Sequence, residues 1–236
     1  MLSLSKKESS KLPVKAVLFD LGGTLVKTSE IPLVMKRILE HHGINRSLEE
    51  ITHARHEAEK GLNFLDLTKL LDEFWVQWNM RILSSLQVKK NTWVLAKYIA
   101  THWWDYSNVV LYPDAEKTLP LLKERGLGVG LITNGLQSDV DNILPKVSLQ
   151  HFFDVVVVID TLRKMKPDSG VFHYAIRKLK TEPSEAVFIG DEIEADYKGA
   201  QSSGLRAYLI DRGSKIKDKS VNKISSLDDL LGLVIQ

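Results

Sequence analysis

The chain has 236 residues, of which 44% are hydrophobic and 26% are charged, and its formal net charge is only +2. This composition is ordinary for a globular protein, and so small a net charge, without a long basic run, argues against a nucleic-acid partner. The sequence contains no cysteine, which excludes disulfides and thiolate chemistry. No stretch has the pattern of a signal peptide or reaches 18 apolar residues, so we expect a cytoplasmic protein without a membrane partner.

The first element expected along the chain is a buried strand over Val14–Asp20, preceded by a tail (residues 1–12) that we expect to be flexible. The strand runs into the sequence FDLGGTL (19–25), so Asp20 stands where the strand gives way to a glycine turn. An aspartate at such a place can simply cap the turn, and by itself it is not evidence of chemistry.

Residues 28–107 show no strand pattern and are predicted to form amphipathic helices. One apolar stripe runs from Ile31 to Leu39 and ends near Gly43, and a second runs from Leu67 to Ile82. All five tryptophans of the chain lie in this segment: Trp75, Trp78, Trp93, Trp103 and Trp104. We interpret them first as packing residues of a small helical unit, and second as an apolar lining for a substrate or a dimer contact.

Beyond residue 107, short apolar segments alternate with helical patterns. Strands are predicted over Leu127–Thr133, Val155–Ile159, Ala186–Gly190 and Arg206–Ile210. Helices are predicted over Ala115–Arg125 with Asp114 as its cap, after the cap Asp168, over Ile193–Ser203 up to Gly204, and over Leu227–Leu233, with a loop at 211–222. The strand segments are continuously hydrophobic, which is typical of parallel strands covered on both faces. We therefore expect an α/β fold with a doubly wound parallel sheet and an inserted helical subdomain.

Polar motifs recur at the ends of these strands. They are LITNG (131–135) with Thr133, KPD (166–168) with Lys166, and GDEIEAD (190–196) with Asp191 and Asp196. Taken singly, the first is ordinary loop chemistry and the second an ordinary helix start. Asp20, Thr133 and Asp191 all follow strands, and ligands of such sheets bind beyond the carboxyl ends of the strands. The motifs therefore predict one common site.

An aspartate, a threonine, a lysine and a carboxylate pair, in this order on strand ends, resemble the motifs of the haloacid dehalogenase-like hydrolases. The resemblance covers roughly residues 14–210. It implies a Rossmann-like core formed by residues 13–27 and 108–236, and a helical cap formed by residues 28–107 that closes over the active site. The activity that it implies is hydrolysis of a small phosphorylated metabolite through an aspartyl phosphate.

The resemblance also assigns roles to individual residues. Asp20 is the nucleophile, Thr133 donates to a phosphate oxygen and Lys166 neutralises charge, while Gly23, Asn134 and Gly135 join Thr133 and Lys166 in binding the substrate. The implied cofactor is Mg²⁺, held by Asp20, the backbone carbonyl of Gly22 and Asp191, with Glu192 and Asp196 orienting the groups around it. Oxygen ligands of this kind suit Mg²⁺, and phosphoryl transfer depends mainly on positioning and charge stabilisation.

Gly22 departs from the family pattern. Most phosphatases of the family carry there a second aspartate, which protonates the leaving oxygen, and such help contributes about 10²–10⁴-fold. Three explanations stay open. The substrate has a good leaving group, such as an acyl or aryl phosphate; Glu192 or a cap residue such as His41 or His42 supplies the proton; or the chemistry differs.

Different chemistry would mean a metal-independent haloacid dehalogenase or a phosphonatase, both of which lack the second aspartate. We rank the Mg²⁺-dependent phosphatase first, because the chain retains the carboxylate pair Asp191 and Asp196 that dehalogenases usually lack. A phosphonatase would need a Schiff-base lysine from the cap, where nothing in the sequence distinguishes a candidate. A catalytically silent phosphate-binding module is the hypothesis from another class. The sequence indicates neither the substrate nor the oligomeric state.

Overall fold

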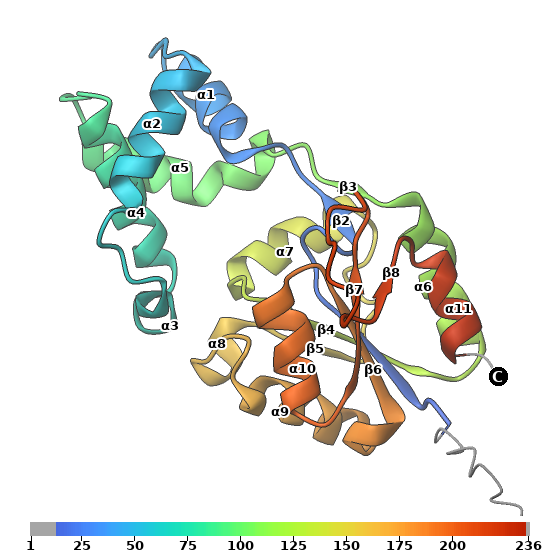
Figure 1. Cartoon of the computed structure of the whole chain (residues 1–236). Helices are drawn as coiled ribbons and strands as arrows, with labels where there is room; N and C mark the ends of the chain where they lie inside the picture. Colours follow the sequence, from blue (N-terminus) through green and yellow to red (C-terminus); the bar gives the residue numbers. More distant parts are fainter. Residues whose placement is uncertain (1–12, 235–236) are drawn as a thin grey trace, which may run out of the picture.

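The computed structural model describes residues 13–234, so the tail expected at residues 1–12 lies outside the described part of the chain. Its centre is a six-stranded sheet of order β5-β4-β1-β6-β7-β8, in which every neighbouring pair is parallel (Figure 1). The strands are β1 (Ala16–Phe19), β4 (Gly128–Ile132), β5 (Val155–Val157), β6 (Ala186–Gly190), β7 (Arg206–Ile210) and β8 (Lys223–Ile224).

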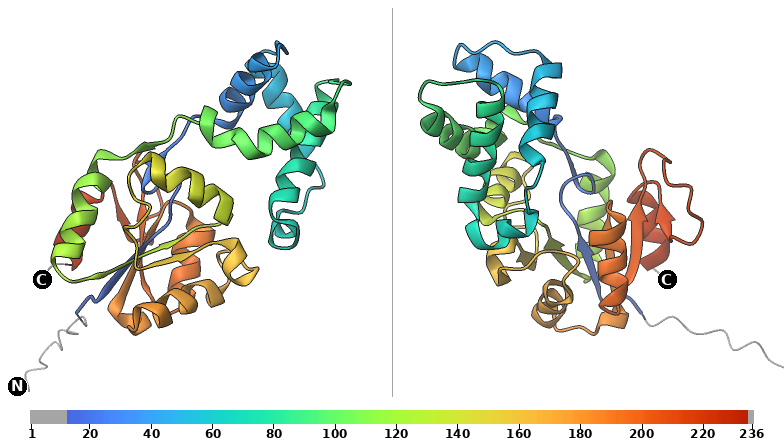
Figure 2. Two further views of the ribbon diagram at one scale, coloured as in Figure 1. Left: turned by 180° about the vertical axis from the view of Figure 1, so that it is seen from behind. Right: turned by 60° about the vertical axis from the view of Figure 1, so that its left-hand side comes forward.

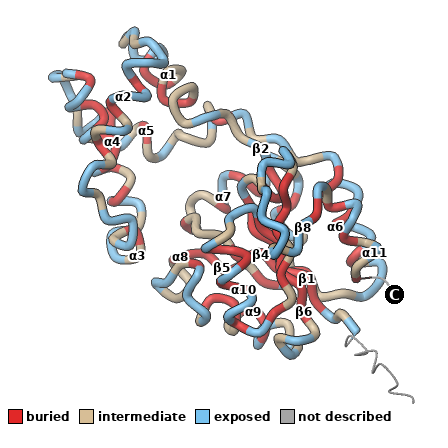
Figure 3. Tube along the Cα trace, viewed as in Figure 1, coloured by how far each residue is buried: buried red, intermediate tan, exposed pale blue. Residues whose placement is uncertain are grey.

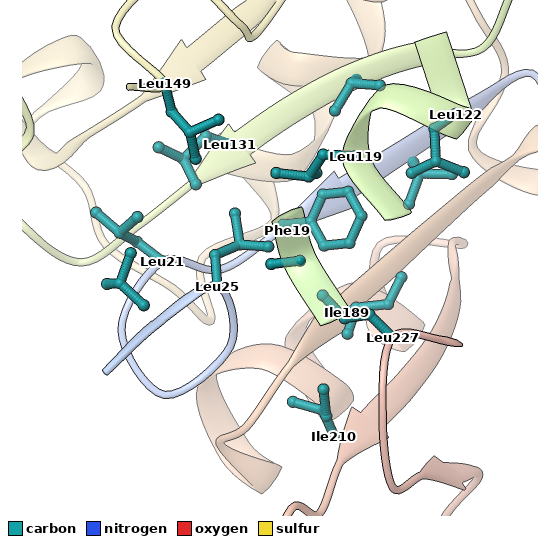
Figure 4. Close-up of a cluster of buried hydrophobic side chains, with 14 of the residues drawn as sticks. Phe19, Leu21, Leu25, Leu119, Leu122, Leu131, Leu149, Ile189, Ile210 and Leu227 are labelled. Carbon is teal, nitrogen blue, oxygen red and sulfur yellow. The ribbon is translucent and has the colours of Figure 1, made fainter. Parts of the chain in front are cut away.

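Helices cover both faces of this sheet, and the side chains of β1 alternate between the two. Val17 and Phe19 belong to the cluster on one face, which Figure 4 shows around Phe19, while Ala16 and Leu18 belong to the cluster on the other. The first face carries α6 (Pro113–Glu124), α7 (Gln137–Lys146) and α11 (Asp228–Val234); the second carries α9 (Ser169–Leu179), a π-helix (Ile193–Lys198) and α10 (Gly199–Ser202). The expected doubly wound parallel sheet is confirmed.

The five expected strands are present, although β1, β4 and β5 are shorter than their predicted ranges. Ile159, expected in β5, instead begins the short helix α8 (Ile159–Leu162). The sixth strand, β8, has no counterpart among the sequence predictions, because two residues at the edge of a sheet give no periodic signal. It follows residues 211–222, which form the expected loop.

Asp114 does not cap its helix, which corrects the sequence prediction. Helix α6 begins at Pro113 with Tyr112 as its N-cap, because proline suits the first helical position. The Asp114 carboxylate instead accepts hydrogen bonds from Arg212 Nη1 (2.7 Å) and from the backbone N–H of Leu227 (2.8 Å). Burial alone would raise the pKa of Asp114, but these bonds outweigh it and lower the pKa. The carboxylate thus ties the C-terminal segment to α6.

The helix predicted over Ile193–Ser203 also differs in its first turns. It begins as the π-helix, in which the N–H groups of Asp196 and Tyr197 both donate to the carbonyl of Glu192 (3.1 Å each). The predicted end is confirmed at Gly204, whose φ of +84° lies in the region that favours glycine. The predicted cap of α9 is confirmed as well, since Asp168 accepts a hydrogen bond from Gly170 N–H (2.8 Å).

Residues 28–107, here called the cap segment, form five α-helices beside the sheet (Figures 1 and 2). They are α1 (Ile31–His41), α2 (Leu48–Glu59), α3 (Leu67–Leu70), α4 (Asp72–Ser85) and α5 (Thr92–Tyr106), with a 3-10 turn at Phe64–Asp66. The predicted second stripe is broken at Leu71, whose φ is +53°. The cap segment buries a cluster of its own, and its buried positions stand apart from those of the sheet in Figure 3.

Two kinds of connection join the cap segment to the rest of the chain. A short antiparallel pair, β2 (Val26–Lys27) and β3 (Val110–Leu111), carries the chain into the segment and back. A small apolar cluster packs Leu67 and Phe74 of the cap segment with Leu136 and Ile159. Among residues 13–234, no helix has the length and apolar character needed to cross a membrane.

Candidate active site

Three neighbouring strands place the nucleophile candidate and its neighbours at one edge of the sheet. Phe19, the last residue of β1, stands opposite Leu131 of β4 and Ile189 of β6, and the backbone N–H of Asp20 donates to the Ile189 carbonyl (2.9 Å). Asp20 therefore leaves its strand one residue before the level of Thr133 and Asp191, which follow β4 and β6. This juxtaposition follows from the register of parallel strands.

Lys166 reaches this edge from the loop before α9. Its Nζ donates to Asp20 Oδ1 (2.7 Å) and Asp196 Oδ1 (2.5 Å), and the side chain is almost fully buried. Burial alone would lower the pKa of Lys166, but the two carboxylates outweigh it and raise the pKa. The amine is thus held as an ammonium ion, which is a point charge and not a base.

The side chain of Asn134 fixes the backbone of this lysine. Its Oδ1 accepts a hydrogen bond from Lys166 N–H (2.7 Å), and its Nδ2 donates to the Lys166 carbonyl (3.1 Å). The sequence resemblance assigned Asn134 to substrate binding. The structure adds a positioning contact between the motif after β4 and the motif before α9.

Three carboxylates converge beside the lysine. Oxygen atoms of Asp20, Asp191 and Asp196 lie within 4.8 Å of one another. Burial, with repulsion from Asp196, raises the pKa of Asp20 to about 6 although Lys166 opposes the shift. Asp191 has solvent on one side, but partial desolvation and its acidic neighbours raise its pKa to about 7. One lysine does not compensate this charge, and a hard divalent cation with oxygen ligands fits the donor set.

Two glycines make room for the carboxylates. A Cβ on Gly23, which has a φ of +73°, would lie 2.2 Å from Asp191 Oδ2, and a Cβ on Gly190 would lie 2.3 Å from Cγ of Asp196. The side chains of Asp191 and Asp196 could not keep their places if the glycine beside each were a larger residue. The sequence assigned Gly23 to substrate binding and gave no role to Gly190, so this steric role was not predicted from the sequence.

The remaining candidates lie around this cluster. Thr133 Oγ1 accepts a hydrogen bond from Gly135 N–H (3.2 Å), so its proton is free to donate to a substrate oxygen. Glu192 is exposed, and its backbone N–H donates to Asp196 Oδ2 (3.0 Å). A Cβ on Gly22 would meet nothing within 4 Å. His42 packs against Tyr98 of α5, with 4.5 Å between ring centroids.

Comparison with known proteins places this fold and site in a family. The family model described as haloacid dehalogenase-like hydrolase matches residues 17–210, which is most of the chain. The chain belongs to this family, and it is a hydrolase. The sequence resemblance is thereby confirmed.

The individual relatives are distant from this chain in sequence. The chain is 28% identical over 204 residues to a glyceraldehyde 3-phosphate phosphatase of Methanopyrus kandleri, covering 85% of each chain. It is 29% identical over 245 residues to the enzyme of that name from Methanocaldococcus jannaschii, covering 94% of this chain and 97% of the relative. A solved structure of a 2-haloacid dehalogenase from Pseudomonas syringae has a TM-score of 0.69 at 22% identity, covering 94% and 98% of the two chains, which bears on the fold alone.

Proposed function

We propose that this hydrolase is a Mg²⁺-dependent phosphatase that cleaves a small phosphorylated molecule through an aspartyl phosphate on Asp20. The observation that carries the proposal is the ion-pair chain Asp20–Lys166–Asp196, with Asp191 completing a carboxylate cluster within 4.8 Å. The phosphatase names of the two archaeal relatives support the same activity. The cap segment would serve as the lid over this site.

Each residue of the candidate site has its own role in the proposed reaction. Lys166 holds Oδ1 of Asp20, which fixes the carboxylate for attack by its other oxygen on phosphorus. The P–O ester bond breaks as the Asp20 O–P bond forms, and water then hydrolyses the acyl phosphate and restores the carboxylate. Thr133 would donate to a phosphate oxygen throughout. Mg²⁺, held by Asp20, Asp191 and the Gly22 carbonyl, would supply charge stabilisation for the transferring group.

The carboxylate cluster favours this activity over the alternatives in the family. A metal-independent dehalogenase would have to keep Asp191 and Asp196 beside a charged Asp20 with only Lys166 to compensate them, which is electrostatically unfavourable. A silent phosphate-binding module would gain nothing from a carboxylate nucleophile at Asp20, because carboxylate and phosphate repel each other.

The first prediction is chelator-sensitive hydrolysis of p-nitrophenyl phosphate, whose good leaving group needs little protonation. We expect EDTA to lower phosphate release by at least about 100-fold. Since the metal must displace a proton from Asp191, the Mg²⁺ concentration for half-maximal rate should fall as the pH rises from about 6 to about 8. Halide release from 2-chloropropionate that is unaffected by EDTA would indicate a dehalogenase. No turnover of either substrate, with Mg²⁺ bound, would indicate the binding module.

The second prediction is that Gly22→Asp extends the enzyme to poor leaving groups. Position 22 has space for a side chain, and an added carboxylic acid could protonate a departing alkoxide. We expect kcat/KM for p-nitrobenzyl phosphate to rise by about 10²-fold, with a much smaller change for p-nitrophenyl phosphate. Gly22→Asn, which has the same shape and no acidic proton, is the control. Equal gains in both variants would contradict the acid role.

A further inference from the structure

A cavity of about 280 Å³ lies between the cap segment and helix α7. Its wall contains Thr28, Ser29, Ile31, Trp75, Trp78, Asn79, Ala100, Trp103, Trp104 and Asp139. Four of the five tryptophans of the chain therefore surround one space. The neighbouring positions of α5 and α7 are visible in Figures 1 and 2, and Trp104 Nε1 of α5 donates to Asp139 Oδ1 of α7 (2.8 Å).

This cavity adjoins the phosphate-binding end of the candidate site. Asp139, in the first turn of α7, lines the cavity and also contacts the turn after β4, since its Oδ2 accepts a hydrogen bond from Leu136 N–H (2.8 Å). The position of a Cβ on Gly135 lies 3.3 Å from Asp139 Oδ2 and 3.5 Å from Thr133 Oγ1. The wall of the cavity and the hydroxyl proposed to bind phosphate are thus joined by one three-residue turn.

The surface that the wall presents to the cavity is mainly apolar. Trp78 Nε1 and Asn79 Oδ1 have no partner within residues 13–234, but they have almost no accessible surface and therefore do not face the cavity. The one charged residue of the wall is Asp139, whose pKa is raised by burial and also by Asp72 and Asp160. A group that carries a negative charge would be disfavoured here.

The substrate must also suit a site without an acid at Gly22. A phenol-type oxygen departs easily because the aromatic ring delocalises its electron pair, whereas an alkyl oxygen needs a proton. Tryptophan rings provide large flat surfaces that pack well against another ring.

We infer that this cavity binds the leaving group of the substrate, and that this group is an uncharged, flat aromatic or heteroaromatic alcohol. The inference rests on the proposed phosphatase activity and names its substrate class. The Asp20 O–P bond forms and the aryl O–P bond breaks, with the electron pair leaving on the aryl oxygen. Water protonates this oxygen afterwards.

A cationic leaving group is the competing occupant, because indole rings also bind cations. Phosphocholine is the probe for it. Its alkyl oxygen makes phosphocholine a poor substrate under either hypothesis, so binding to Asp20→Asn protein decides between them. Choline should bind more weakly than 4-methylumbelliferone if the cavity takes an uncharged ring.

The test compares two aryl phosphates, 4-methylumbelliferyl phosphate and 1-naphthyl phosphate, with acetyl phosphate and phosphocholine. Acetyl phosphate has a good leaving group and no ring. We expect KM for the two aryl phosphates to be at least about 10-fold below that for acetyl phosphate. Ala100→Leu, which places bulk in the cavity, should raise KM for both aryl phosphates by about 10-fold and change KM for acetyl phosphate by less than about twofold.

Two further variants provide a control for this test and an alternative to its main variant. Trp93→Phe is the matched control, because Trp93 is 56% exposed and lies outside the cavity wall. Should Ala100→Leu fail to fold, Trp103→Phe shrinks one ring of the wall and should impair both aryl phosphates while sparing acetyl phosphate. Binding of 4-methylumbelliferone to Asp20→Asn protein, followed by tryptophan fluorescence, measures the cavity without turnover and should weaken in the double variant with Ala100→Leu.

The outcomes separate the two proposals. Hydrolysis of acetyl phosphate without any aryl preference, or a preference for phosphocholine, would overturn the cavity inference and leave the phosphatase standing. An unchanged KM for 4-methylumbelliferyl phosphate in folded Ala100→Leu would also overturn it. Loss of turnover with every phosphate, while 4-methylumbelliferone still binds, would overturn the phosphatase and not the aromatic cavity.

Discussion

Replacing Asp20 with asparagine is expected to lower kcat for p-nitrophenyl phosphate by on the order of 10⁴-fold or more, as loss of a covalent nucleophile does in other hydrolases. Asparagine has the same shape, but its amide cannot form the acyl phosphate. The fold should persist, because Lys166 keeps its ion pair with Asp196.

The direction in which Asp20→Asn changes the stability of the protein follows from the raised pKa of Asp20. With a folded-state pKa of about 6, above its ordinary value of 3.8, Asp20 stabilises the protein fully below about pH 4, and this contribution is lost as the pH rises through about 6. At neutral pH without metal, the charged side chain therefore opposes folding, and Asp20→Asn should have a Tm no lower than that of the wild type. Thermal unfolding by circular dichroism measures this, alongside the kinetic assay.

A matched control lies close by in the chain. Asp168→Asn changes a carboxylate two residues after Lys166, at the N-cap of α9, where asparagine caps equally well. We expect its activity to be unchanged within about twofold. Substantial phosphatase activity in Asp20→Asn, with Asp168→Asn as active as the wild type, would exclude the covalent mechanism.

Much of the fold could be predicted because its physical signals are local. The continuous apolar character of residues 186–190 and 206–210 requires strands that are buried on both faces, and the structure places β6 and β7 inside the sheet. Once the strands are parallel, their carboxyl ends share an edge, so Asp20, Thr133 and Asp191 converge without further information.

The contacts that complete the site could not be predicted because they depend on tertiary distance. The need for glycine at positions 23 and 190 comes from carboxylates approaching from other segments, of which the sequence gives no sign. The clamp between Asn134 and the Lys166 backbone joins residues 32 positions apart. Asp114 misled the prediction for a similar reason: an aspartate near a helix start suggests a cap, but Arg212 and Leu227 reach it from the C-terminal segment.

The same distinction applies to the tryptophans. Their presence in one segment is visible in the sequence, and core packing explains some of it, since Trp78 belongs to the cluster of the cap segment. That four of them border one cavity follows from how α4 and α5 cross and from the bond between Trp104 and Asp139. Substrate selection is thus expected to lie in contacts between segments, whereas the bond-breaking residues lie in motifs.

The second large effect is expected for Lys166→Met, which keeps the length of the side chain and removes its charge. Asp20, Asp191 and Asp196 would then stand within 4.8 Å of one another without the buried cation. Breaking a buried ion pair by removing one partner costs about 3–5 kcal/mol, and we expect the free energy of unfolding to fall by about this amount at pH 8. Turnover should fall by on the order of 10³-fold, because charge compensation and the orientation of Asp20 are both lost.

This loss of stability should depend on pH and on metal. Removing the ammonium raises the pKa values of the carboxylates further above their unfolded-state values, so the variant gains stability as the pH falls and loses it as the pH rises through those values. Mg²⁺ should restore part of the stability at pH 8, since a cation among the carboxylates compensates the same charge. Urea unfolding at about pH 5 and about pH 8, with and without Mg²⁺, measures both effects.

Lys164→Met, which removes an exposed lysine paired with Asp168, is the control and should change stability by less than about 1 kcal/mol. A Lys166→Met protein as stable as this control at pH 8 would show that the carboxylates do not depend on the lysine for compensation.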